Sequence, residues 1–575
     1  MTHRIRTTLA AILALLAMLP VLGRWPLAVA QTAPVVSRPA PVVAPHGMVV
    51  AQEKRAAQIG AEILKKGGNA VDAAVAVGFA MAVTHPQAGN LGGGGFMLIH
   101  RADRNETVAI DYRETAPAAI TRDTFLDDKG EADPRKSRDS ALAIGVPSTV
   151  AGLALAHERY GSGKFTLADL IAPALTLARN GVEVEDDLAD SLPRAQTKLE
   201  RWPSTAKIFL NTDGSVIRPG QDLLQADLAA SLAAIARDGP RAFYEGWIAE
   251  KIVASVRAAG GVMTRDDLAR YRPIVRPVVR GTYRGYDILS MPPPSSGGVA
   301  LIEMLNILEG FRLGELPRGR ATHVMIEAMK LAYADRAEFL GDPAFVDVPV
   351  KGLTSKAYAA KLAATIGDAP RPARAIRAGN PREGSNTTHF SVVDRNGNAV
   401  ANTTTLNFSY GLGLVAEGTG ILLNNQLDDF AVKPNSPNAY GLVGGAANAP
   451  GPGKRPLSSM SPTIVLKDGK VFLVTGSPGG SRIITIVLDV ITNVIDRRMN
   501  IAEAVAAPRL HHQWLPDEVS VEPNVPDDLV WSLENQGYPV RRAPPWGSAN
   551  SILVTPAGLA GAADPRTRGS LAAGE

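Results

Sequence analysis

The hydrophobic pattern after residue 50 predicts two helices followed by two strands. Apolar positions recur at helical spacing over residues 51–66, where two glycines end the pattern. Asn69 then begins a second helix that runs to about residue 83, because asparagine is a preferred N-cap residue. Residues 97–100 and 107–111 are predicted to be strands. The chain therefore starts as a mixture of helices and strands.

Residues 140–380 carry mainly helical patterns with loops between them. Examples are residues 167–180, where Pro173 predicts either a kink or a split, and residues 321–340. The sequence Met-Pro-Pro-Pro-Ser-Ser-Gly-Gly at 291–298 interrupts the region and opens another helix. No long linker and no internal repeat marks a domain boundary.

A strand pattern dominates after residue 386. Residues 387–394 alternate and are rich in β-branched side chains, and residues 399–406 read as a returning strand. Asn396 and Gly397 between them predict a hairpin. The composition upstream, over residues 370–385, is rich in Pro, Arg, Gly and Asn and predicts an exposed loop.

The length of the hairpin loop decides which residue lies opposite Thr387. A two-residue loop would pair Thr387 with Leu406, whereas a three-residue loop that includes Arg395 would pair Thr387 with Thr405. Both registers bring two threonines close together. The sequence alone leaves the choice open.

A glycine-rich segment at residues 89–96 has two interpretations. Such a run can cradle phosphates, but this one leads into a strand and no Lys-Ser or Lys-Thr follows it. Close packing of backbone against backbone is the better interpretation.

Composition excludes several classes of function. The chain has 575 residues, 45% of them hydrophobic and 20% charged, which is typical of a globular protein. It has no cysteine, which excludes disulfides, thiolate metal sites and a cysteine nucleophile. The net charge of +4 has no dense basic stripe behind it, so nucleic acid is not an expected partner.

The first 30 residues predict a secretory signal peptide. Three basic or imidazole side chains precede an apolar run at residues 9–22, and Ala-Val-Ala at 28–30 suits signal peptidase. The alternative is a membrane anchor, but the run is shorter than the roughly 20 residues that span a bilayer. Export, most simply to a periplasm, is the expectation.

Three polar segments follow residue 423. They are residues 424–430, dense in amides and carboxylates; residues 455–462, with serines beside Arg455; and residues 475–482, with small residues before a helix near Ile483. Backbone N–H groups at a helix start suit an oxyanion. Together the segments resemble a site for a zwitterionic, amino-acid-like ligand.

From about residue 45 to residue 566 the chain resembles the γ-glutamyltranspeptidases, which are N-terminal-nucleophile hydrolases. The resemblance is carried, in order, by GNAVDAAVA, GNLGGGGF, DYRE, PPPSSGG, YADRAEFLGDP, NTTHFSVVD, NNQLDDF, RPLSSMSPT, GSPGGSRI and PRLHHQWLP. It implies an α+β fold, a four-layer αββα sandwich with two stacked antiparallel sheets between helical layers.

The resemblance also implies self-cleavage of a precursor between Asn386 and Thr387. The fragments 31–386 and 387–575 would form one intertwined domain, a heterodimer of the chain's own pieces. The freed α-amine, with a reference pKa of about 7.7–8.0, would act as base for the Thr387 hydroxyl. Thr405 would support that hydroxyl, and Gly479 and Gly480 would form the oxyanion hole. No metal or other cofactor is implied.

The remaining site residues are implied by motif position. Arg113, with Ser458 and Ser459, would bind the α-carboxylate of a γ-glutamyl group, and Asp429, with Asn407 and Gln426, would hold its α-ammonium. A lid over residues 433–450 would carry Tyr440 as its gate. His511 and His512 suggest a metal, but adjacent strand residues point to opposite faces and no nearby carboxylate completes a site. Packing is the expectation for that pair.

The implied activity is transfer of the γ-glutamyl group of glutathione or related donors, through a γ-glutamyl-Thr387 ester, to water or to amino acid and dipeptide acceptors. One alternative in the same fold is a glutaryl-cephalosporin acylase or a polyglutamate-processing enzyme. A glutaryl group has no ammonium for Asp429, which argues against the cephalosporin substrate. Another alternative is a periplasmic binding protein without turnover, which the intact set of nucleophile and oxyanion residues argues against.

Overall fold

The computed structural model describes residues 38–376, 387–433 and 444–575. From Pro39 to Glu575 the chain forms one compact unit, as the lack of a linker predicts. The predicted signal peptide, Asn386, Tyr440 and most of the predicted loop over residues 370–385 lie outside the described residues. No helix in the described part of the chain is long and apolar enough to cross a membrane.

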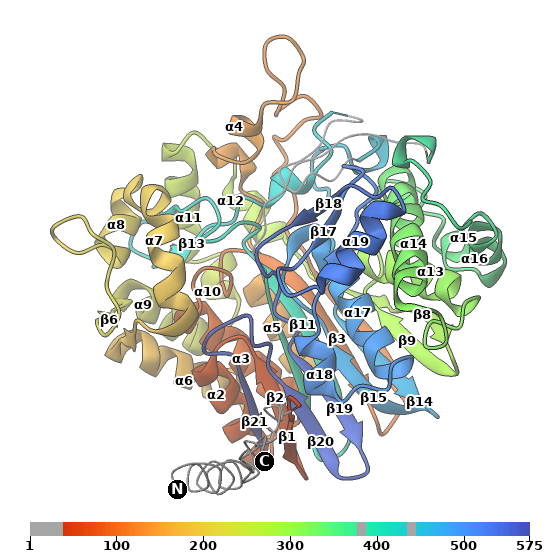
Figure 1. The fold of residues 1–575 in the computed structure, drawn as a ribbon. Helices are drawn as coiled ribbons and strands as arrows, with labels where there is room; N and C mark the ends of the chain where they lie inside the picture. Colours follow the sequence, from red (N-terminus) through yellow and green to blue (C-terminus); the bar gives the residue numbers. More distant parts are fainter. Residues whose placement is uncertain (1–37, 377–386, 434–443) are drawn as a thin grey trace, which may run out of the picture. The chain divides into compact units, whose positions relative to one another are not determined.

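Two seven-stranded antiparallel sheets lie at the centre of the molecule (Figure 1). The first has the order β21 (Leu571–Gly574), β2 (Met48–Ala51), β10 (Thr388–Val393), β11 (Ala399–Thr405), β3 (Gly94–Arg101), β4 (Glu106–Tyr112) and β7 (Ile274–Pro277). The second has the order β1 (Val42–Ala44), β20 (Gly558–Ala562), β19 (Ser551–Thr555), β15 (Lys470–Thr475), β14 (Thr463–Lys467), β9 (Tyr286–Ser290) and β8 (Val279–Tyr283).

Helices cover the outer face of each sheet. The first sheet packs against α2 (Lys54–Lys65), α3 (Ala70–Thr84) and α5 (Thr149–Tyr160), with α6 (Leu167–Asn180) and α9 (Ala226–Asp238) beyond them. The second sheet packs against α13 (Gly297–Glu309) and α18 (Ile501–Ala506), and α13 in turn packs against α17 (Ile483–Ile495) and α14 (Arg318–Phe339). The four-layer αββα architecture expected from the resemblance is therefore confirmed.

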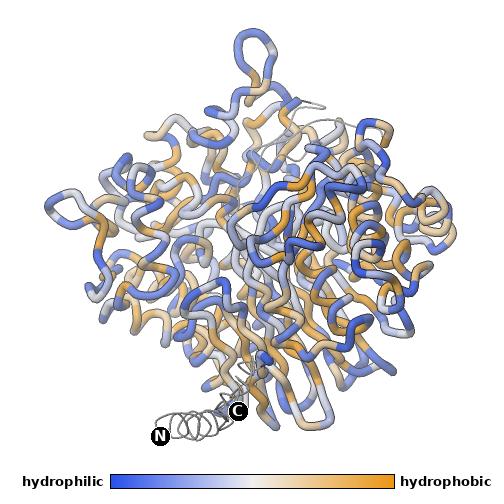
Figure 2. Tube along the Cα trace, viewed as in Figure 1, coloured by the Kyte–Doolittle hydropathy of each residue, from blue (hydrophilic) through white to orange (hydrophobic). Residues whose placement is uncertain are grey.

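Strand β3 shows why these strands are apolar on both faces. Phe96 and Leu98 belong to the core between the two sheets, whereas Met97 and Ile99 belong to the core beneath α2 and α3. Successive side chains of a strand point to opposite faces, and here both faces are covered. Figure 2 accordingly shows hydrophobic segments concentrated in the central strands and hydrophilic ones in the outer loops.

The two predicted cleavage fragments interleave within both sheets. In the first sheet β10 and β11 lie between β2 and β3, and in the second β20, β19, β15 and β14 lie between β1 and β9. Glycines in β3 and just before it let this segment approach β11. A Cβ on Gly95 would lie 2.5 Å from the Thr403 carbonyl oxygen, and one on Gly93, which precedes β3, would lie 2.2 Å from that of Thr405. The packing interpretation of the glycine run is confirmed.

The local predictions hold with one correction. The helix expected over residues 51–66 begins at Lys54, because Ala51 pairs with β10 and β21 as the end of β2, and Glu53 caps the helix. Asn69 and Asp72 form a capping box for α3, as predicted. Helix α6 spans the predicted residues and continues through Pro173 without a split.

Candidate functional site

The hairpin of β10 and β11 places Thr387 opposite Thr405. Thr388 pairs with Thr404 and Val393 with Ala399, which is the register of the three-residue loop. Thr387 Oγ1 donates a hydrogen bond to Thr405 Oγ1 over 3.4 Å. Thr405 Oγ1 also accepts from the Asn407 backbone N–H at 2.9 Å. The two hydroxyls are therefore held side by side at the end of the hairpin.

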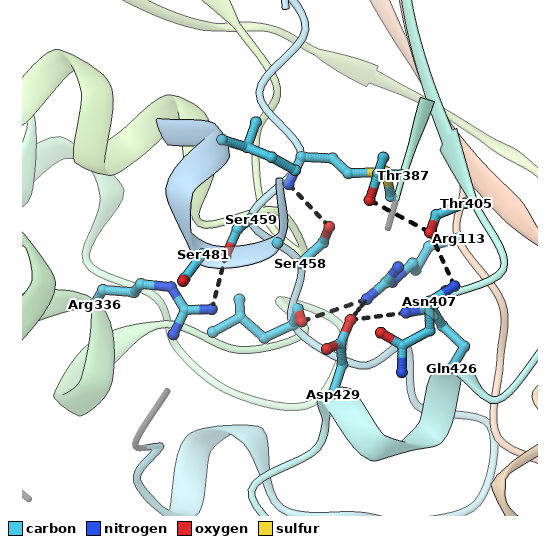
Figure 3. A pocket seen from close by; sticks show the side chains of 14 residues that line it. Arg113, Arg336, Thr387, Thr405, Asn407, Gln426, Asp429, Ser458, Ser459 and Ser481 are labelled. Atoms are coloured by element: carbon cyan, nitrogen blue, oxygen red, sulfur yellow. Dashed lines mark hydrogen bonds and ion pairs between the residues drawn. The ribbon is translucent and has the colours of Figure 1, made fainter. Parts of the chain in front are cut away.

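A pocket opens at this point, and its side chains are drawn in Figure 3. It contains about 310 Å³ of unfilled space, its mouth included. Most of the predicted site residues line it: Arg113, Thr387, Thr405, Asn407, Gln426, Asp429, Ser458, Ser459 and Gly480. Gly479 directly precedes this lining, and Tyr440 and Asn386 are not described. Residues from positions 113 to 480 thus converge on one cavity.

Arg113 and Asp429 form a buried ion pair in the pocket wall. Arg113 Nη2 donates to Asp429 Oδ2 at 2.5 Å, and Gln426 Nε2 donates to the same oxygen at 2.7 Å. The Arg113 side chain is 1% exposed and that of Asp429 is 12% exposed. Burial raises the pKa of Asp429, while the charge of Arg113 opposes that rise. This ion pair therefore offers one fixed positive and one fixed negative charge to a ligand.

Backbone and side-chain groups hold the Arg113 guanidinium in place. Its Nε donates to the Pro456 carbonyl at 3.1 Å, and Asp111 accepts from the Arg113 backbone N–H at 2.9 Å. Arg455 donates to Asp111 Oδ1 at 3.0 Å and to the Arg113 carbonyl at 2.8 Å. Arg455 therefore acts as a support beneath the pocket rather than as part of its lining.

Glu114 lies directly behind this ion pair. Its carboxyl is fully buried, 3.9 Å from Arg113 Nη1. Burial raises the pKa of Glu114 to about 7; Arg113 opposes the rise, and the charge of Asp429 adds to it. The ionisation of Glu114 and Asp429 is therefore linked through one arginine.

The glycine pair lies between β15 and α17, where the sequence predicts a turn into a helix. Gly479 has φ +140° and Gly480 has φ +56°, and a short 3₁₀ turn over Gly480–Arg482 leads into the helix. Both φ values are in the range that side chains disfavour, so glycine is required there. Gly480, which has no side chain, thus presents its backbone to the pocket, and Ser481 beside it also lines the pocket.

Arg336 is a pocket residue that the sequence reading missed. It projects from α14, with Nε donating to Ser296 Oγ at 2.9 Å and Nη2 to Ser459 Oγ at 3.3 Å. Burial lowers its pKa to about 10. It belongs to the block YADRAEFLGDP, which was the only sign of it in the sequence.

The serine turn is fixed by the segment before α13. The Ser458 backbone N–H donates to the Pro294 carbonyl at 2.9 Å. The backbone N–H and the side-chain hydroxyl of Ser296 both donate to the Ser458 carbonyl, each at 2.7 Å. The PPPSSGG and RPLSSMSP blocks therefore shape one wall of the pocket together.

His511 and His512 are both buried and lie away from the pocket lining. His511 hydrogen-bonds Thr485 and Gln513, and His512 lies 3.3 Å from Asp517. No group of three or more His, Cys, Asp or Glu side chains in the described residues is arranged to hold a metal ion. The contacts of this pair are those of packed core residues.

The arrangement is suited to acyl transfer on a zwitterionic substrate. It combines a hydroxyl pair, a glycine turn that can supply N–H groups to an oxyanion, and a charge pair in the pocket wall. A ligand with a carboxylate and an ammonium on one carbon can exchange partners with Arg113 and Asp429 without leaving either charge unpaired.

Comparison with known proteins agrees with the geometry. A family model described as gamma-glutamyltranspeptidase matches residues 56–574. The glutathione hydrolase proenzyme of Escherichia coli (strain K12) is 54% identical over 540 residues, which cover 93% of each chain.

Solved structures give the same architecture. The cephalosporin acylase from Bacillus halodurans superposes with a TM-score of 0.83 at 29% identity, covering 95% of this chain and 98% of that one. The Helicobacter pylori gamma-glutamyltranspeptidase chain matches with a TM-score of 0.53 at 45% identity, over 54% of this chain and 89% of that one.

Proposed function

This chain belongs to the γ-glutamyltranspeptidase family, and we propose that it is an exported, self-cleaving γ-glutamyltransferase that also hydrolyses glutathione. The observation that carries the proposal is the placement of Thr387 beside Thr405 in a pocket that also holds the Arg113–Asp429 pair. Glutathione carries on its γ-glutamyl group the carboxylate and ammonium that this pair complements.

Self-cleavage precedes turnover. The Thr387 hydroxyl attacks the carbonyl of Asn386, the peptide bond to the Thr387 nitrogen breaks, and water hydrolyses the resulting ester. This gives fragments 31–386 and 387–575, after removal of the signal peptide 1–30 on the way to the periplasm. The interleaving of strands in both sheets supports a stable heterodimer of the two fragments.

Turnover uses the new N-terminus. The α-amine of Thr387 takes the hydroxyl proton as Oγ1 attacks the γ-carbonyl, and Thr405 stabilises the hydroxyl through the bond that joins them. Gly479 and Gly480 supply N–H groups to the oxyanion. The leaving amine takes the proton, and water or an amino acid or dipeptide acceptor then attacks the γ-glutamyl-Thr387 ester.

Binding of the γ-glutamyl group rests on the charged residues that line the pocket. Arg113 would bind its α-carboxylate with help from Ser458 and Ser459, and Asp429 would bind its α-ammonium with help from Asn407 and Gln426. Tyr440 would close the pocket as the gate of a lid over residues 433–450. Arg336, which donates to Ser459, adds positive charge on the carboxylate side.

Assay with γ-glutamyl-p-nitroanilide, with and without glycylglycine, tests the proposal. A γ-glutamyltransferase releases p-nitroaniline in both cases and faster with the acceptor. The second candidate, a glutaryl acylase, is suggested by the likeness to the cephalosporin acylase. A glutaryl acylase would turn over glutaryl-p-nitroanilide in preference to γ-glutamyl-p-nitroanilide. If the protein turned over neither donor, both candidate functions would be refuted.

A further inference from the structure

The glycine turn before α17 has no side chain at its two central positions. Gly479 and Gly480 both have φ values in the left-handed region, where glycine is conformationally permissive. A backbone bond from the Arg482 N–H to the Gly479 carbonyl, 3.0 Å long, closes the turn on itself. Ser481 is the next residue, and it also lines the pocket of Thr387. The contacts of Ser481 therefore bear directly on the position of the glycine N–H groups.

Tyr333 holds the backbone of Ser481 from α14. The Tyr333 hydroxyl donates to the Ser481 carbonyl, and the tyrosine is 1% exposed. Burial raises the pKa of Tyr333, so the hydroxyl keeps its proton and remains a donor. Three residues later on α14, Arg336 donates to Ser459 Oγ. Because residues three apart share a helix face, one face of α14 contacts both the glycine turn and the serine turn.

Gln513 holds the side chain of the same serine. Ser481 Oγ donates to Gln513 Oε1 at 2.6 Å, and His511 Nε2 lies 3.0 Å from that oxygen. Burial lowers the pKa of His511, so its ring is neutral. An amide oxygen can only accept, so the ring proton is on Nε2, and Nδ1 accepts from Thr485 Oγ1 at 2.9 Å. A chain of hydrogen bonds thus connects Ser481 to the first turn of α17 (Ile483–Ile495).

The two contacts meet in a buried region outside the pocket lining. The Tyr333 ring lies edge-on to the ring of His511, which ends β16 (Leu510–His511), with centroids 5.8 Å apart and an angle of 84°. Ser481 is 4% exposed and Gln513 is 5% exposed. Removal of either partner would leave a buried polar group of Ser481 without its hydrogen bond, and such a group is costly to leave unpaired. The turn would then shift from its present position.

We propose that Tyr333 and Gln513 are positioning residues for acyl transfer: they hold Ser481 and so fix the turn that directs the Gly479 and Gly480 N–H groups at the oxyanion. This inference rests on the proposed function and deepens it, because it assigns a role to two residues that do not line the pocket. Preorganised donors stabilise the oxyanion more than the ground-state carbonyl. The contribution of both residues should therefore appear in kcat rather than in KM.

Tyr333→Phe removes the hydroxyl and keeps the ring. Outright loss of an oxyanion donor costs about 100- to 1000-fold in kcat, so a loosened turn should cost less, about tenfold. Acylation and deacylation each pass through an oxyanion and should slow together, so KM for γ-glutamyl-p-nitroanilide should stay within about twofold. Rates are expressed per cleaved chain, as counted on a denaturing gel.

Tyr283→Phe is the matched control. Tyr283 on β8 is also buried, and its hydroxyl donates to Asp496 Oδ2 at 2.7 Å, away from the pocket lining. This variant should keep the wild-type kcat and KM although it loses a buried hydroxyl too. A wild-type kcat in Tyr333→Phe, or an equal loss in Tyr283→Phe, would overturn the proposal.

Ser481→Ala tests the second contact with the loss of a single oxygen. It removes the hydroxyl that Gln513 holds, and it carries the test even if Tyr333→Phe fails to fold. Its kcat should fall and its KM should not change. A wild-type kcat, or a raised KM with an unchanged kcat, would contradict the proposed role of Gln513.

A boronic acid distinguishes positioning from general damage to the site. In 2-amino-4-boronobutanoic acid a boronic acid replaces the γ-carboxyl group of glutamate. Thr387 Oγ1 bonds to the boron as its proton passes to the α-amine, which gives a tetrahedral, negatively charged adduct. Tyr333→Phe should weaken inhibition by this compound about tenfold and leave inhibition by glutamate, a ground-state ligand, unchanged. Equal losses for the two inhibitors would overturn the proposal, whereas failure of the proposed function would appear as no turnover of γ-glutamyl-p-nitroanilide by the wild type.

Discussion

Replacing Asp429 with asparagine removes one negative charge from the pocket and changes its shape very little. An amide oxygen can still accept from Arg113 and Gln426, which donate to Asp429 over 2.5 and 2.7 Å. The donor's α-ammonium, however, would lose its counter-charge. A hydrogen bond to a charged partner is worth about 1.5–3 kcal/mol, which corresponds to roughly ten- to a hundredfold in kcat/KM. The kcat/KM of Asp429→Asn for γ-glutamyl-p-nitroanilide should therefore be roughly ten- to a hundredfold lower than that of the wild type.

The informative quantity is the ratio between two donors. A glutaryl group lacks the ammonium, so the wild type should reject glutaryl-p-nitroanilide, and Asp429→Asn should narrow the gap. Asp428→Asn makes the same change one residue away, at a carboxylate that accepts from Ser137 Oγ at 2.6 Å and does not line the pocket. Self-cleavage should persist in both variants, since it involves no ligand ammonium. An unchanged ratio of kcat/KM in Asp429→Asn would show that Asp429 does not read the amine.

Three further predictions concern the nucleophile, the guanidinium and the buried carboxyl. Thr387→Ala should remain a single inactive chain on a denaturing gel, and Thr387→Ser should still cleave; two bands from the alanine variant would refute the assignment. Arg113→Ala should raise KM for γ-glutamyl donors roughly ten- to a hundredfold, with partial rescue by Arg113→Lys, because an ammonium lacks the two-donor fork; an unchanged KM would remove Arg113 from the site. Because burial raises the pKa of Glu114 from 4.5 to about 7, the folded protein holds a proton that the unfolded chain releases between these values. The contribution of Glu114 to the free energy of unfolding should therefore fall by about 3 kcal/mol as the pH rises from about 4.5 to about 7. Urea unfolding of uncleavable Thr387→Ala, with and without Glu114→Gln, measures this; equal pH slopes would contradict it.

Local signals in the sequence predicted much of the fold. The Asn69 and Asp72 cap fixed the start of α3 because both partners lie within one turn. The start of α2 was placed too early, since the pairing of Ala51 with distant strands is not visible locally. The hairpin register stayed open because Asn-Gly is compatible with either loop length, and strand pairing settled it in favour of Thr405.

The site was less accessible to local reasoning. Polar segments after residue 423 indicated a zwitterionic ligand, but only the family resemblance connected them to Arg113, which is more than 300 residues away from Asp429. Arg336 was missed because nothing in the helical pattern of α14 distinguishes a residue that faces a pocket from one that faces a core. The contact with Ser459 that reveals it joins residues 123 positions apart.

The interleaving of β10 and β11 between β2 and β3 means that the protein refolds differently before and after cleavage. An intact precursor can refold as one chain, whereas two cut fragments must first find each other, so recovery after denaturation becomes dependent on protein concentration. After cleavage, a denatured molecule would thus fail to refold at high dilution, although the intact precursor had folded there. The working life of the cut enzyme would then be set by how slowly its two sheets open, rather than by an equilibrium between folded and unfolded forms.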